Sequence, residues 1–148
     1  MNVAFGGLVL HIADGWMNES TLVFTMPPLA MAASMTLNKL HQAPPAALTI
    51  TWEEAAGRSP KTLLDERMGQ VKKALQRFEE TGQGDLGSRH DPIPWIEYSF
   101  DAQGPLQQIL IIRGVEHRLV CISGRALAPH SPAVRTRFVA AATDLKAG

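Results

Sequence analysis

Short segments in which apolar and polar residues alternate dominate this sequence, and such alternation is typical of half-buried β-strands. Residues 48–52 show it most regularly, with Leu48, Ile50 and Trp52 on one face. The same criterion predicts strands at five further segments: 8–12, 21–25, 95–100, 106–113 and 117–123. Only short turns separate the last three strands, which predicts an antiparallel meander.

Two other segments have apolar residues at helical spacing, and each follows a Ser-Pro pair, a combination that favours a helix start. Ser59-Pro60 leads into an apolar stripe of Leu64, Met68, Val71, Leu75 and Phe78. This stripe predicts a helix from residue 60 to about residue 78, ending before Gly82. Ser131-Pro132 leads into a second stripe of Val134, Phe138, Ala141 and Leu145. Strands on both sides of one long helix, followed by a second helix, indicate an α+β domain.

Two segments interrupt these patterns. Residues 26–47, rich in Ala, Met and Pro, are interpreted as an insertion between two strands. Residues 82–94, rich in Gly and Pro, are interpreted as a connection that contains a short strand near residues 86–89. Although residues 20–38 carry no charge, their Ser, Thr and Asn residues and the Pro27-Pro28 pair disfavour a membrane span.

Composition narrows the class of protein. The chain has 148 residues, the usual size of one domain, so residues 1–148 are expected to form a single domain. Its 14 Lys and Arg residues balance its 14 Asp and Glu residues, which argues against binding nucleic acid or an anionic membrane through bulk charge. The first Lys or Arg is Lys39, so no secretory signal is recognised and a cytoplasmic protein is expected. The single cysteine excludes an internal disulfide.

Candidate catalytic residues are few. Cys121 lies within a predicted strand, and His117 or His130 could activate it, but catalytic thiolates usually lie in exposed, electropositive settings. A small core or surface residue is therefore the favoured interpretation of Cys121, with a nucleophile as the alternative. None of the five His residues has the spacing of a metal site, and no Gly-rich phosphate-binding motif follows a strand. We therefore expect no enzyme, no metal and no cofactor.

One predicted strand is apolar on both of its faces. Within residues 106–112, Ile109 and Ile111 lie on one face, and Leu110 and Ile112 lie on the other. Either a helix covers each face of the sheet, or one face is reserved for an apolar partner. Six Met residues would suit an adaptable binding surface, although filling gaps in a core is their commoner use.

The order of these elements resembles that of DcrB-like domains. Asp14 and Trp16, with Ser20 and the strand that follows, resemble the opening motif of that family, D-x-W-x-D-x-S. The later blocks that match are the strand 48–53 with Gly57, the helix 59–78, Glu97-Tyr98, the Gln108 strand, the strand 119–123 and the segment 130–138. Within this group the chain is most similar to the Eag chaperones of bacterial type VI secretion, over residues 8–146 apart from the insertion.

The resemblance implies a PsbP-like α+β fold, with a curved antiparallel sheet, helices packed on one face, and a homodimer. It implies a non-enzymatic chaperone or adaptor that binds the hydrophobic N-terminal transmembrane segments of a secreted effector, typically one with a PAAR spike domain. Such a chaperone keeps these segments soluble in the cytoplasm and aids loading onto the secretion spike, without itself entering the membrane. A PsbP-like ligand- or protein-binding module with no secretion role is the alternative.

The resemblance also implies an effector-binding groove, formed by Thr21, Val23, Thr49, Gln108, Leu110 and Ile112. A shift of one residue in the strand before the helix would replace Thr49 by Ile50. In this groove Val23, Leu110 and Ile112 would supply apolar contacts. Gln108 would form hydrogen bonds to the cargo, as polar side chains do between membrane helices.

Overall fold

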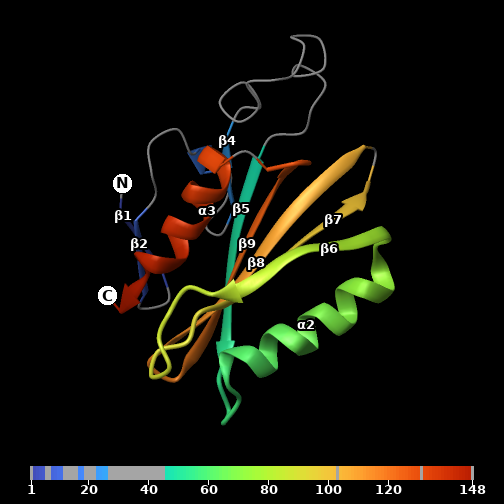
Figure 1. Cartoon of the computed structure of the whole chain (residues 1–148). Coiled ribbons are helices and arrows are strands. Elements are labelled where there is room, and N and C mark those ends of the chain that lie inside the picture. Colours follow the sequence, from blue (N-terminus) through green and yellow to red (C-terminus); the bar gives the residue numbers. More distant parts are fainter. Residues whose placement is uncertain are drawn as a thin grey trace.

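The computed structural model of the chain (Figure 1) describes residues 2–5, 8–11, 17–18, 23–26, 46–102, 104–130 and 132–147. Thr21 and nearly all of the predicted insertion lie outside these residues. The main sheet is antiparallel and has the order β3 (Met17–Asn18), β4 (Val23–Met26), β5 (Ala46–Glu54), β9 (Arg118–Leu127), β8 (Pro105–Val115), β7 (Pro94–Asp101) and β6 (Gln76–Asp85). A small second sheet has the order β1 (Asn2–Phe5), β2 (Leu8–His11) and β10 (Lys146–Ala147).

The predicted meander is confirmed. Strands β7, β8 and β9 follow one another along the chain and pair as antiparallel neighbours. Strand β5 pairs with β9 over its length, so that Leu48 and Ile50 lie opposite Gly124 and Ile122. The meander and β5 therefore form the centre of the sheet, and β6 forms one of its edges.

The first helix, α2 (Pro60–Ala74), begins where the sequence predicts and ends earlier. The Ser59 hydroxyl accepts a hydrogen bond from the backbone N–H of Thr62 at 3.2 Å, as a helix cap does. The backbone becomes extended at Leu75, and β6 begins at the next residue. Phe78 therefore belongs to a strand, yet it packs against the same apolar cluster as the helix. The apolar stripe therefore runs from the helix α2 into the strand β6. The spacing of its apolar residues alone could not reveal where the helix ends.

The connection 82–94 also differs from the prediction. Strand β6 extends to Asp85, so Gly82 does not end a helix, and residues 86–89 form no strand. The two glycines of β6, Gly82 and Gly84, lie under the ring of Trp95 on β7; a Cβ at Gly84 would come within 3.0 Å of the indole nitrogen. These glycines therefore allow a close aromatic contact inside the sheet.

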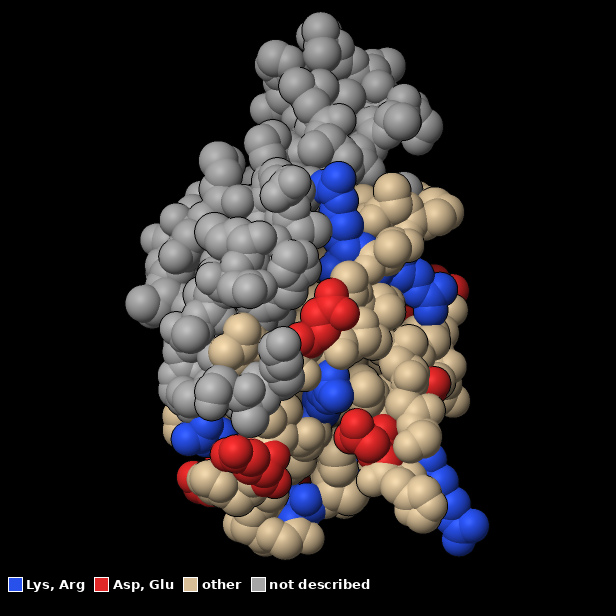
Figure 2. Space-filling view, turned by 90° about the vertical axis from the view of Figure 1, so that its left-hand side faces the viewer, with Lys and Arg blue, Asp and Glu red and all other residues tan. Residues whose placement is uncertain are grey.

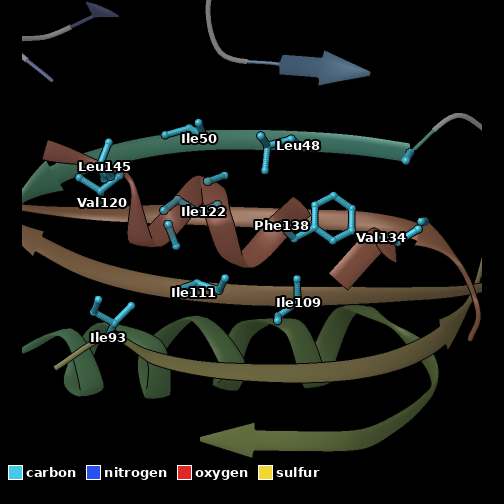
Figure 3. Close-up of a cluster of buried hydrophobic side chains, with 14 of the residues drawn as sticks. Leu48, Ile50, Ile93, Ile109, Ile111, Val120, Ile122, Val134, Phe138 and Leu145 are labelled. Carbon is cyan, nitrogen blue, oxygen red and sulfur yellow. The ribbon is translucent and has the colours of Figure 1, made fainter. Parts of the chain in front are cut away.

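The two helices lie on opposite faces of the sheet, so the expectation that they pack on one face is corrected. Helix α3 (Pro132–Thr143) packs on β8 and β9 and buries Val134 and Phe138 against Ile109 and Ile111 (Figure 3). Helix α2 packs on β8 and β7, in a cluster with Leu110 and Ile112. Because both faces of β8 are apolar, each needs a cover. The other element of the prediction, an antiparallel α+β fold, is confirmed.

Candidate binding face

Four of the six predicted groove residues occupy one face of the main sheet, the face on which α2 packs: Thr49, Gln108, Leu110 and Ile112. Thr49 on β5 pairs with Val23 on β4 and with Ser123 on β9, and Ser123 in turn pairs with Leu110 on β8. Directly paired residues of antiparallel strands lie on the same face, so this register forms one row across the sheet. Gln108 and Ile112 lie two residues from Leu110 and share its face. Thr21 lies outside the described residues.

This face has a covered part and an open part. Leu110 and Ile112 are only 4% and 0% exposed, because α2 lies over β7 and β8 and packs Leu64 and Met68 against them. The expectation that the whole face is open is therefore wrong for these two aliphatic residues. They belong to the core, and a ligand does not reach them in this structure.

The open part lies over β5 and β9, and we call it the open strip: Ala47, Thr49, Thr51, Ser123 and Arg125. Thr51 and Arg125 are exposed, and Ala47, Thr49 and Ser123 are half-buried. Apart from Arg125, these side chains are small. Small side chains allow the backbone of a neighbouring helix to approach closely, and hydroxyl groups can bond to it.

Gln108 lies at the border between the covered and the open part, and both ends of its amide are already bonded. Its Nε2 donates to the Ser123 hydroxyl at 2.6 Å, and its Oε1 accepts from Nε of Arg125 at 2.9 Å. The Arg125 guanidinium also lies over the Phe100 ring, 4.9 Å from its centre. After these two bonds the amide still has one N–H and one lone pair with which it can bond to a cargo.

Sequence reasoning missed four residues of the open strip: Ala47 and Thr51 on β5, and Ser123 and Arg125 on β9. The two residues of β9 bond to the predicted Gln108. Ser123 and Arg125 lie two and four residues after Cys121 and therefore share its face of β9. The sequence predicts that this strand ends at residue 123, whereas it continues to Leu127. Alternation along β9 could have placed them on one face. Their pairing with Thr49 and Gln108 depends on the register between strands, which the sequence does not show.

The geometry does not favour Cys121 as a nucleophile. Its side chain is 9% exposed, and burial raises the pKa of the thiol, an effect that Arg67 and the Thr51 hydroxyl partly oppose. His130 contacts Gln107, which lies on the other face of β8, and His117 lies 3.5 Å from Glu54. The two histidines that could have activated the thiol therefore have other partners.

A separate cleft lies between α2 and the edge of the sheet. It contains two cavities of about 320 and 380 Å³, both lined by Lys61, Leu64 and Gln83. The first extends to Met68 and Ile96, and the second to Trp95 and four further residues: Gly84, Asp85, Pro92 and Pro94. Apolar and charged side chains line this cleft together, and its size is within the range of small-molecule sites.

In the described part of the chain, neither the charged side chains nor the possible metal ligands gather into a recognisable binding site. On the side of the molecule drawn in Figure 2, acidic and basic side chains of the described residues are interspersed. The described ranges hold no group of three or more His, Cys, Asp and Glu that could bind a metal ion. No helix within them is both long and apolar enough to cross a membrane.

No protein-family model and no curated protein matches the sequence. Solved structures do match. PsbP of the cyanobacterium Synechocystis (CyanoP) has a TM-score of 0.61 at 10% identity, over 96% of this chain and 87% of that chain. LpqN of Mycobacterium tuberculosis, a protein involved in cell envelope biogenesis, has a TM-score of 0.61 at 12% identity, over 94% and 82%. Protein PA94 of Pseudomonas aeruginosa, of unknown function, has a TM-score of 0.57 at 12% identity, over 94% and 90%. The chain therefore has a PsbP-like fold.

Proposed function

We propose that this protein is a non-enzymatic chaperone or adaptor of type VI secretion, which binds the hydrophobic N-terminal segment of a PAAR-containing effector and aids its loading onto the spike. The observation that carries the proposal is the open strip. It occupies the sheet face that the resemblance to Eag chaperones assigns to the cargo, and it continues the register row of Val23, Thr49 and Leu110.

The chemistry of the open strip suits a membrane-type helix that is rich in small residues. Thr49, Thr51 and Ser123 offer hydroxyl groups, and Ala47 leaves room for close backbone contact. Each Å² of apolar cargo surface removed from water contributes about 25 cal/mol. Leu110 and Ile112 act indirectly in this arrangement, since they hold α2 against β8 as one wall beside the strip.

Co-expression with the N-terminal segment of the effector encoded beside this protein tests the proposal. Thr49→Glu places a charge in the open strip, and we expect it to abolish co-purification while the circular dichroism spectrum stays unchanged. Thr136→Glu, at an exposed position of α3, is the matched control and should retain the cargo. Retention of the cargo by Thr49→Glu would show that the strip is not the binding face.

The second candidate is a ligand- or protein-binding module without a secretion role, and the cleft between α2 and β6 favours it. Gln83→Trp fills this cleft from an exposed position. Under the chaperone proposal this variant binds the cargo normally. Loss of binding in Gln83→Trp alone, with Thr49→Glu unaffected, would favour the second candidate.

The proposed chaperone is a homodimer, because two sheets side by side offer a longer surface to a helix of about 20 residues, which is about 30 Å long. Light scattering should therefore give twice the chain mass of 16.1 kDa. A strict monomer at high micromolar concentration would contradict this part of the proposal.

A further inference from the structure

A buried acid–base pair, Glu97 on β7 and His130 ahead of α3, lies on the α3 face of the sheet, away from the open strip. The side chain of His130 is 1% exposed and that of Glu97 is 9% exposed. Glu97 Oε2 lies 3.4 Å from His130 Nδ1, and neither atom meets the geometry of a hydrogen bond with any described residue. Two uncompensated polar atoms at such depth are costly unless a proton joins them.

The surrounding hydrogen bonds fix the positions of all other protons in this cluster. His130 Nε2 lies 2.8 Å from the backbone oxygen of Gln107, which can only accept, so Nε2 carries a proton. The backbone N–H of His130 donates to Gln107 Oε1 at 2.6 Å, and Gln107 Nε2 donates to the Thr81 hydroxyl at 3.1 Å. Thr81 then donates to Glu97 Oε1 at 3.3 Å.

These hydrogen bonds do not determine whether a proton lies between His130 Nδ1 and Glu97 Oε2. With Nε2 protonated, a neutral imidazole presents a lone pair at Nδ1, and an ionised carboxylate presents a lone pair at Oε2. The pKa of the His130 imidazole is lowered in the folded protein: burial is the main cause, Arg135 of α3 adds to it, and Glu97 and the hydrogen bond to the Gln107 backbone oppose it. A histidine at this place without its acidic partner would therefore be neutral.

We propose that His130 and Glu97 hold a single proton between them, and that this proton fastens the start of α3 to the sheet. With one proton the pair is neutral overall and forms a hydrogen bond. With none, two lone pairs and one buried negative charge face each other. With two, both groups are donors, and the extra positive charge lies near Arg135.

The consequence for stability has a definite sign. In the unfolded chain, histidine takes up a proton below about pH 6.5 and glutamate below about pH 4.3. Above about pH 6.5, and for as long as the native pair keeps its proton, the native state binds one more proton than the unfolded chain, so the unfolding equilibrium constant rises tenfold per pH unit. Between about pH 4.3 and 6.5 both states bind one proton, and this pair makes no contribution to the slope.

Glu97→Gln is the decisive variant, since the new amide can donate to Nδ1 and still accept from Thr81. Its native state binds no proton at this place, so its unfolding constant rises tenfold per unit as the pH falls below about 6.5. Between about pH 5 and 8, the unfolding constant of the unmodified protein divided by that of the variant should therefore rise with pH, by about tenfold per pH unit for as long as the native pair keeps its proton. A ratio that stays flat over this range would overturn the proposal.

The chain offers a matched control in the exposed pair of His117 and Glu54, with a separation of 3.5 Å. Glu54→Gln should leave the same ratio flat. If Glu97→Gln does not fold, ¹⁵N spectra of the histidine-labelled unmodified protein decide the question. We expect a protonated Nε2 and a hydrogen-bonded Nδ1 at His130 between about pH 5 and 7. The signal of an Nδ1 without a hydrogen bond would overturn the proposal.

Discussion

The two faces of the sheet use the same strands and differ in how completely they are covered. On the α3 face, the cluster that includes Leu48, Ile109, Ile122 and Phe138 is aliphatic with one aromatic ring, and these four side chains are fully buried. On the α2 face, the covered part contains aromatic residues such as Tyr98 and Phe100, and the part over β5 and β9 stays open.

This difference shows that burial, rather than strand identity, separates core from candidate binding surface. Strand β8 contributes core residues to both faces, whereas β5 contributes Leu48 and Ile50 to one core and the small residues Ala47, Thr49 and Thr51 to the open strip. The polar side chains of β5 thus mark where α2 stops covering the sheet. Four substitutions and titrations can break or sharpen this comparison.

The largest effect is expected at Leu110, which was predicted as a binding residue and lies in the core. Leu110→Glu removes a buried side chain and introduces an unpaired charge, which should cost about 4 kcal/mol or more of unfolding free energy. Thr49→Glu, in the same register row, should cost about 1 kcal/mol or less. Urea unfolding measures both. Equal losses would show that the two parts of the face are not distinct.

A high-pH titration examines the covered part of the α2 face through Tyr98, the only tyrosine of the chain. Burial raises the pKa of its hydroxyl to about 12, and Arg125 opposes this shift. The unfolded chain loses this proton near pH 10, so stability present below about pH 10 falls by about 2–3 kcal/mol as the pH approaches 12. Tyrosinate absorbance should titrate near 12 in the folded protein. A midpoint near 10 before unfolding would mean that α2 leaves this residue open.

On the α3 face, the close contact of Gly124 with Phe138 gives the next effect. A Cβ at Gly124 would overlap the Phe138 ring, whereas a Cβ at Gly114 would find its nearest neighbours 4.0 Å away. Gly124→Ala should therefore destabilise the protein by about 1–3 kcal/mol, and Gly114→Ala should change it little. Thermal unfolding compares the two. A neutral Gly124→Ala would mean that α3 packs loosely on its face.

The smallest effect is expected at Cys121, at the border of the open strip. Because burial raises the pKa of its thiol, thiol reagents should react slowly with the folded protein and quickly after unfolding. Cys121→Ser should keep cargo binding within a few-fold. A turnover that disappears in this variant would contradict the non-enzymatic proposal.

The sequence by itself determined the elements whose signals are local. Alternation placed β5 and the β7–β9 meander, and the two Ser-Pro pairs placed the starts of α2 and α3. Parity along each strand also assigned Thr49 and Leu110 to faces. These features depend on neighbouring residues alone, since side-chain direction repeats every two residues in a strand and helix caps act within one turn.

Only the tertiary structure decided which of these faces and residues became core. The end of α2 was misplaced because Leu75 and Phe78 serve the same cluster from a different element. Leu110 is core and Thr49 is open because α2 covers β7 and β8 but not β5. The pairing of Glu97 with His130 joins segments far apart in the sequence. Coverage and pairing depend on strand register and helix position, which are set by the packing of the whole chain rather than by any local pattern.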